Sequence, residues 1–146
     1  MNIGTTSSEL FGPGEFRATR IARPVEELER ATRFYRDVLG LPVLASFEGH
    51  SGYDGVFFAL PGGAEPELTH GPAGPVESSD EDLLVLYAGS DVDFRSVVER
   101  LAAAGAQRLE AANPCWNVWG ATFLDPDGYR LVIATSAPAR SVGDQG

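Results

Sequence analysis

Two histidines are the side chains of this sequence that titrate nearest to neutral pH. His50 lies in the glycine-rich stretch from Glu48 to Gly55, which is typical of a connection between strands, and His70 ends the run from Glu67 to His70. Because imidazole exchanges a proton near pH 7, either histidine could act as a general base. Alternatively, both are solvated side chains or bond to the backbone, and the sequence leaves both interpretations open.

The segment from Asn113 to Gly120 concentrates both tryptophans, Trp116 and Trp119, and the single cysteine, Cys115. Indoles on a connection between strands need cover, because exposed aromatic surface is costly. They could pack as core plugs, form a contact between two copies of the chain, or line an aromatic wall over a flat ligand. No base is adjacent to Cys115, so we expect an inert thiol rather than a nucleophile.

The stretch from Asp125 to Gly128, with the sequence DPDG, carries two further carboxylates. Asp, Pro and Gly are the residue types that a tight turn between strands requires. We therefore assign this stretch to structure rather than to chemistry.

Length and composition exclude several classes of protein. A chain of 146 residues with 43% hydrophobic and 22% charged residues is typical of one globular domain. The formal net charge of −10 repels phosphate backbones and anionic lipids, so neither nucleic acid nor a membrane is an expected partner. One cysteine permits no internal disulfide, and residues 1–14 do not resemble a signal peptide, which predicts a cytoplasmic protein.

The same layout occurs twice along the chain. Apolar residues recur at helical spacing in two segments, Leu28, Ala31, Tyr35, Val38 and Leu39 in the first and Phe94, Val97, Val98, Leu101 and Ala102 in the second. A glycine follows each stripe, Gly40 and Gly105, as is typical just after a helix. Asp91 is placed to cap the start of the second helix.

Each predicted helix follows one extended run and precedes three more. The predicted strands are Arg17–Arg23, Val43–Glu48, Gly55–Leu60 and Glu67–His70, then Leu83–Ala88, Gln107–Glu110, Ala121–Leu124 and Tyr129–Thr135. We therefore predict an α+β fold of two βαβββ modules, about 15–72 and 82–137, whose curved mixed sheets form a central cleft. Residues 1–14 are expected to be a flexible arm and 138–146 a flexible tail.

The string ELERATRFYRDVLGL from Glu27 to Leu41, together with DPDGY from Asp125 to Tyr129, resembles the vicinal oxygen chelate superfamily. This group includes glyoxalase I, extradiol dioxygenases, fosfomycin-resistance enzymes and bleomycin-resistance proteins. The resemblance covers about Phe16 to Ala134 and implies the two-module fold, but no single reaction, because the group hosts several enzyme classes and metal-free binders. It also implies a homodimer, in which each cleft is sometimes built from two chains.

Catalytic members usually hold a divalent metal with His, Gln or Glu side chains from the first and last strand of each module. Counted from the helix string, the resemblance places these positions at Arg20, Glu67, Leu84 and Val132. Only Glu67 could bind a metal, and a hard ion normally needs three or more side chains. A relocated site of His50, Asp54, Glu67 and His70 matches no ligand motif. The resemblance therefore implies no metal and no cofactor.

Arg20 and Glu67 are expected to lie side by side, since the first and last strands of a module are neighbours in this fold. The guanidinium would keep Glu67 ionised without a metal. Such a pair could simply neutralise a buried carboxylate, or Arg20 could serve an anionic or carbonyl-bearing ligand.

Three functions remain open. The first is metal-independent binding of a small aromatic or polyketide-like metabolite, either for sequestration and resistance or as a cofactor-free tailoring enzyme. Its expected ligand-binding residues are Arg20, Glu67, Leu84, Trp116, Trp119 and Val132, and its candidates for proton transfer are His50, His70, Arg20 and Glu67. The second is a metal-dependent lyase, isomerase or dioxygenase with an atypical ligand set. The third is a protein-interaction module.

Overall fold

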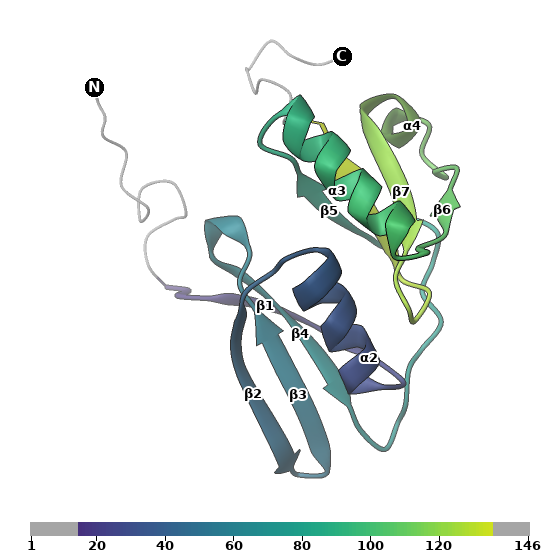
Figure 1. Ribbon diagram of the computed structural model, residues 1–146. Helices are drawn as coiled ribbons and strands as arrows, with labels where there is room; N and C mark the ends of the chain where they lie inside the picture. The colour runs from purple at the N-terminus through teal and green to yellow at the C-terminus, as the bar shows by residue number, and fades with distance from the viewer. Residues whose placement is uncertain (1–14, 136–146) are drawn as a thin grey trace, which may run out of the picture.

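Each half of the chain contains a strand, a helical segment and three more strands, in the order that the repeat predicts (Figure 1). The computed structural model describes residues 15–135. The first module comprises β1 (Thr19–Pro24), α2 (Leu28–Arg33), the π-helical turn η1 (Phe34–Val38), β2 (Val43–His50), β3 (Tyr53–Phe58), the 3₁₀ turn η2 (Pro61–Gly63) and β4 (Ala64–His70). The second comprises β5 (Leu83–Tyr87), α3 (Asp91–Ala103), β6 (Arg108–Leu109), α4 (Cys115–Trp119), β7 (Gly120–Leu124) and β8 (Arg130–Ala134). The expected arm 1–14 and tail 138–146 lie outside the described residues.

The strands form two four-stranded mixed sheets, one in each module. Their orders are β1-β4-β3-β2 and β5-β8-β7-β6. The first strand of each module pairs in parallel with the last, whereas the other neighbours are antiparallel. Parallel neighbours need a long connection, which the helix and the intervening strands supply. The predicted α+β fold of two βαβββ modules is confirmed.

The first helix buries the predicted stripe but changes its winding halfway. Leu39 N donates to Phe34 O at 3.1 Å, a spacing of five residues, so an α-helical segment continues as a π-helical turn. The sequence predicted one continuous helix. The change of winding leaves both Phe34 and Tyr35 buried, and Gly40 ends the segment with a φ of 78°.

The second helix starts and packs slightly differently from the prediction. Ser90, rather than Asp91, is the N-cap, because Ser90 has an extended backbone and its Oγ accepts from Asp93 N at 3.1 Å. Leu101 is fully buried, but Ala102 at the edge of the predicted stripe is exposed.

The helix-covered sides of both sheets meet in one hydrophobic core. Its members include Ala31, Tyr35, Val56, Phe58 and Leu68 from the first module and Leu101, Phe123, Leu131 and Ile133 from the second. Because strand side chains alternate, the other side of each sheet points away from this core. We call these sides the first open face (Arg20, Ala22, Ala45, Phe47, Gly55, Phe57, Glu65 and Glu67) and the second open face (Val85, Tyr87, Thr122, Val132 and Ala134). On the second open face, Thr122, Val132 and Ala134 are nevertheless buried, and α4 packs against β7 and β8.

The turn from Asp125 to Gly128 fastens the second module to the first. The Tyr35 hydroxyl donates a short hydrogen bond to Asp125 Oδ2, and the Tyr129 hydroxyl donates to Pro24 O at 2.6 Å. Burial raises the pKa of the Asp125 carboxyl, although its hydrogen bonds oppose this, and burial beside Asp125 raises the pKa of Tyr35 well above 10.0. These contacts support the structural assignment of the turn.

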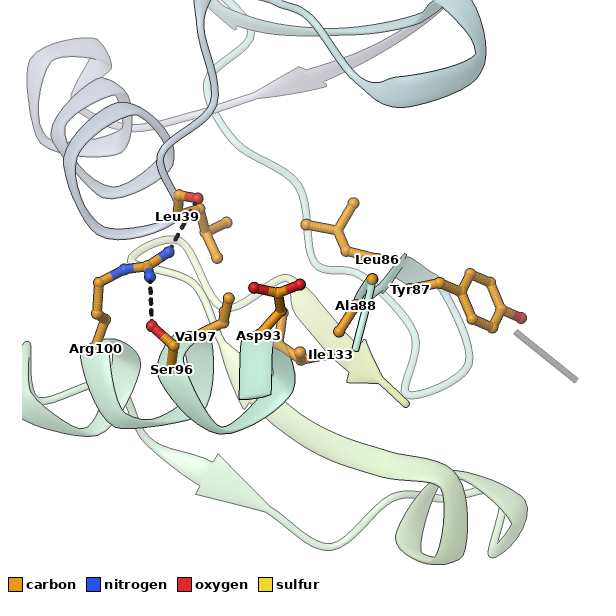
Figure 2. Close-up of a pocket in the computed structure, with 10 residues that line it drawn as sticks. Leu39, Leu86, Tyr87, Ala88, Asp93, Ser96, Val97, Arg100 and Ile133 are labelled. Carbon is orange, nitrogen blue, oxygen red and sulfur yellow. Dashed lines mark hydrogen bonds between the residues drawn. The ribbon is translucent and has the colours of Figure 1, made fainter. Parts of the chain in front are cut away.

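The helical segments of the two modules also touch directly (Figure 2). Arg100 of α3 donates from Nε to Val38 O at 2.9 Å and from Nη2 to Leu39 O at 3.5 Å. Figure 2 shows Leu86 directed toward Leu39, whereas Tyr87, the next residue of β5, points the opposite way. Leu86 therefore belongs to the shared core, and Tyr87, the next residue of β5, belongs to the second open face.

Candidate functional site

A row of side chains in contact, most of them aromatic, crosses the first open face. The Arg20 guanidinium carbon lies 4.1 Å from the centre of the Phe57 ring. The Phe57 and Phe47 ring centres are 5.8 Å apart, and the imidazole of His50 meets Phe47 edge-on at 6.0 Å. We call these four residues, which come from β1, β3 and β2, the aromatic row. A row of this kind offers stacking surface with a cation at one end and a titratable ring at the other.

Gly55 makes room for the row. It lies opposite Phe47 in the pairing of β2 with β3, and a Cβ placed on Gly55 would overlap the Phe47 ring. A glycine inside a strand often marks such a close approach. The Phe47 ring therefore lies directly over the strand that carries Phe57.

The ionic partner of Arg20 is Glu65, so the predicted pair of Arg20 with Glu67 is wrong. Arg20 Nε donates to Glu65 Oε1 at 3.0 Å, and Glu67 lies level with Ala22 instead. Spacing from the helix string fixes the strand but not its register with β4, which is why the partner was misplaced. The side chains of Arg20 and Glu65 are 56% and 26% exposed, so this pair does not neutralise a buried charge.

Glu67 still shares the first open face with Arg20, whereas the two histidines are separated. Glu67 lies opposite Phe57 in the pairing of β4 with β3 and is half-buried. His50 is exposed at the end of the aromatic row. His70 lies at the end of β4 with Nδ1 3.3 Å from Val25 O, on the helix-covered side of the sheet. The structure thus brings only one histidine to the row.

Leu84 and Val132 lie on opposite sides of the second sheet. Val132 is fully buried on the second open face opposite Val85, whereas Leu84 is opposite Leu131 and packs against the shared core. The superfamily pattern implied that Leu84 lies beside Val132, and the structure shows that it does not. A count that is one residue off moves a side chain to the other face of a strand, and Val85 takes the position.

The tryptophans belong to a short helix that the sequence did not predict, α4. The Trp116 ring meets Tyr87 edge-on at 6.2 Å, beside the second open face. Trp119 is 57% exposed, so it is not a core plug. Asn113 Oδ1 accepts from Cys115 N at 3.1 Å, and an Asn before a proline was the signal that could have indicated this helix start. For Trp119, this leaves a contact between copies or a ligand wall.

Metal donors are few on both open faces. In the described range 15–135, no three side chains of His, Cys, Asp or Glu come together as a metal site requires. The first open face has the carboxylates of Glu65 and Glu67 and, at the end of the aromatic row, His50, and the second has hydrocarbon at the matching strand positions, Val85 and Val132. The residues present do not fit the divalent metal that catalytic superfamily members hold.

Sequence reasoning missed four residues that shape this face: Phe47, Gly55, Phe57 and Glu65. The signal that could have indicated them is the alternation of side chains along a strand. Along β2 it puts Ala45 and Phe47 on one face, and along β3 it puts Gly55 and Phe57 on the same face. Reading that alternation needs the strand register, which the sequence alone did not supply.

A groove also runs between the modules, on the helix-covered side of the first sheet. Its volume is about 570 Å³, and its apolar lining includes Ile21, Phe58, Leu60, Leu84 and Leu86. Arg23 and Asp82 add charge to the lining.

No helix within residues 15–135 has the length and apolar character needed to cross a membrane.

Comparison with known proteins gives the family. Residues 19–65 match the YycE-like N-terminal domain, and residues 81–135 match the YycE-like C-terminal domain. The chain is 40% identical over 121 residues to the protein YycE of Bacillus subtilis strain 168, across 80% of this chain and 86% of YycE. A crystal structure of a YycE protein of unknown function from Bacillus subtilis has a TM-score of 0.78 at 35% identity, covering 86% of this chain and 93% of that chain.

Two further solved structures share the fold. A glyoxylase/bleomycin resistance protein/dioxygenase domain from Frankia sp. EAN1pec has a TM-score of 0.64 at 23% identity, covering 84% of this chain and 98% of that one. TnmS3, an antibiotic binding protein from Streptomyces sp. CB03234, has a TM-score of 0.61 at 25% identity, covering 86% and 100%. The resemblance to the vicinal oxygen chelate superfamily is confirmed. This chain belongs to the YycE-like family within that superfamily.

Proposed function

We propose that this protein binds a small, flat aromatic or polyketide-like molecule without a metal ion, in a cleft between the open faces of two copies. The observation that carries this proposal is the aromatic row, in which Arg20 lies 4.1 Å from the Phe57 ring and Phe47 and His50 continue the row. Flat π-systems bind such surfaces by stacking and apolar burial.

Arg20 supplies the polar anchor. Its bond to Glu65 and its position over Phe57 fix the guanidinium, while 56% of the side chain stays exposed to contact a ligand. A guanidinium held in this way donates well to a carboxylate, phenolate or carbonyl oxygen. We therefore expect a ligand with an oxygen acceptor at the edge of its ring system.

A second copy supplies the cover. Small-molecule sites usually bury most of the ligand, which one sheet face alone does not do. Within one chain the second open face is not available for this, because the helix-covered sides of both sheets meet in the shared core. Thr122, Val132 and Ala134 of the second open face are buried within their own chain, but Tyr87 and Trp119 are exposed there and offer apolar cover from another copy. The proposal therefore includes a homodimer, and the single cysteine favours a cytoplasmic one.

The same faces support metal independence. The second open face adds no donor at Val85 or Val132, so a cleft between two copies holds the carboxylates of Glu65 and Glu67, with the imidazole of His50 at the far end of the aromatic row. Two carboxylates fall short of the ligands that a divalent ion takes from a protein. TnmS3 is an antibiotic binding protein, and this likeness supports sequestration or resistance as the role.

Cofactor-free proton transfer is a second form of this function, and the position of His50 favours it. The imidazole is exposed and ends the aromatic row, so a stacked ligand would have a base at its edge. Recovering the ligand chemically unchanged after incubation with protein supports sequestration. An isomerised product that is not formed by His50→Gln supports catalysis.

The test is a titration of intrinsic tryptophan fluorescence with anthraquinone-2-carboxylate, a flat aromatic anion. Arg20→Gln should weaken binding roughly tenfold or more, since a hydrogen bond between charged groups is lost. Arg33→Gln is the matched control, because Arg33 is an exposed arginine on α2 that pairs with Glu29. Equal affinity of Arg20→Gln and the control, or stoichiometric Mn²⁺, Fe²⁺, Ni²⁺ or Zn²⁺ binding that disappears in Glu67→Ala, would overturn the proposal.

A further inference from the structure

The groove between the modules has one strongly polar end at Arg23. The side chain of Arg23 is 15% exposed, and its Nη2 donates to Asp82 Oδ1 at 3.2 Å. Its guanidinium carbon lies 4.9 Å from the centre of the Tyr129 ring. The other terminal nitrogen, Nη1, is buried with no hydrogen-bond partner in the part of the chain that the structure describes. A buried donor without an acceptor is costly, so an acceptor that reaches it gains affinity.

None of the carboxylates that line the groove accepts a hydrogen bond from Arg23 Nη1. Glu65 and Glu67 contribute to the lining, but their side chains belong to the first open face, where Arg20 and Phe57 lie opposite them. Asp82 is 56% exposed and already holds the other terminal nitrogen of Arg23. The guanidinium therefore has one carboxylate partner, Asp82, while its Nη1 has none in the described part of the chain.

The rest of the groove is apolar and large enough for a ligand. Its volume of about 570 Å³ lies within the roughly 300–1,000 Å³ that small-molecule sites occupy. Ile21 is 59% exposed at its wall, whereas Phe58 and Leu68 form its buried floor. The exposed strand residue lies where an apolar ligand would cover it.

We propose that this groove is a second binding site, for an elongated apolar molecule that ends in a carboxylate, such as a medium-chain fatty acid. The chain would lie along Ile21 and Leu84, and the carboxylate would pair with the Arg23 guanidinium in place of Asp82. This site is on the helix-covered side of the first sheet, so it is separate from the aromatic row on the opposite face.

The test compares decanoate with 1-decanol, which has the same chain length and no charge, by calorimetric titration of the full chain. Decanoate should bind more tightly, and Arg23→Gln should weaken decanoate roughly tenfold or more while leaving decanol unchanged. Asp82→Asn should strengthen decanoate binding a few-fold, because it removes the carboxylate that competes for Arg23. Arg20→Gln, an arginine of the same strand on the other face, should change neither affinity.

Equal affinities for decanoate and decanol, or a wild-type decanoate affinity in Arg23→Gln, would overturn the inference. Because Arg23 also packs on Tyr129, Ile21→Trp is a second variant at an exposed position. Its indole should fill the groove and abolish decanoate binding, and retained binding would equally contradict the site. The anthraquinone titration should be unaffected by Ile21→Trp, so failure of this inference is distinguishable from failure of the proposed function.

Discussion

The two sheets share one topology but carry different chemistry on their open faces. The first open face has an arginine, two carboxylates and a row of aromatic rings, whereas the second is built around Val85 and Val132 with indoles at its margin. Their helix-covered sides are alike, because both pack into the same core. The two modules are thus both apolar where they pack together and differ in chemistry where they face outward. That division suits a polar anchor on one face and an apolar cover on the other.

Two neighbouring residues of β3 test this division most strongly. Phe58 is fully buried in the core, and Phe57 lies on the first open face. Phe58→Ala should lower the free energy of unfolding by about 3–5 kcal/mol, because it leaves a large cavity. Phe57→Ala should cost much less stability but should weaken anthraquinone-2-carboxylate binding roughly tenfold. Urea denaturation measures the stability of each variant, and fluorescence titration measures its affinity for the ligand. Similar stability losses for the two variants would refute the assignment of faces.

Two strand glycines sharpen the comparison between the sheets. A Cβ on Gly120 would overlap the backbone oxygen of Ile133, which cannot move easily, whereas a Cβ on Gly55 would meet the side chain of Phe47. Gly120→Ala should therefore lower the free energy of unfolding by about 1–3 kcal/mol. Gly55→Ala should displace the ring and weaken ligand binding roughly two- to tenfold with a smaller loss of stability. The reverse pattern would show that the aromatic row does not bind the ligand.

Trp119 separates the two interpretations of the second face. If the indole covers the ligand, Trp119→Ala should weaken anthraquinone-2-carboxylate binding roughly tenfold while the dimer persists in light scattering. If it only joins two copies, the variant should become monomeric. Val92→Ala, another exposed apolar residue, on α3, is the control for general surface effects. Unchanged affinity together with an unchanged dimer would remove Trp119 from the site.

The junction behind the two faces should show a small dependence on pH. Burial raises the pKa of Asp125 in the folded protein above its ordinary value of 3.8. The folded state therefore holds this proton more tightly, so its stabilising contribution is full below pH 3.8 and is lost as pH rises through the raised pKa. The stability of the wild type relative to Asp125→Asn should fall across that mildly acidic range. A relative stability that rises there would contradict this description of the buried carboxyl.

The sequence predicted the parts of this molecule that depend on periodicity. Apolar spacing predicted the two helix stripes and the glycines that end them. Together with turn residues such as Asp125 and Gly128, it also predicted the order of helices and strands along the chain. The same reasoning placed Ala102 in a buried stripe, although it is exposed, because spacing gives the face of a helix but not the width of its contact.

The site was predicted only in part, because it depends on register. A two-residue error gave Arg20 the partner Glu67 instead of Glu65, and a one-residue error put Leu84 in the place of Val85. The aromatic row was missed for the same reason, since Arg20, Phe57 and Phe47 meet only when three strands are aligned. Contacts within one segment were accessible from the sequence, and contacts across strands were not.

The most direct test of the central claim is complementation between two defective variants. Arg20→Gln damages the first open face and Trp119→Ala the second, so a purified mixed dimer would combine both defects in one cleft and leave the other cleft intact. We predict one site per mixed dimer with wild-type affinity for anthraquinone-2-carboxylate, although neither homodimer binds well. A mixed dimer without any restored site would show that the two faces do not join across copies.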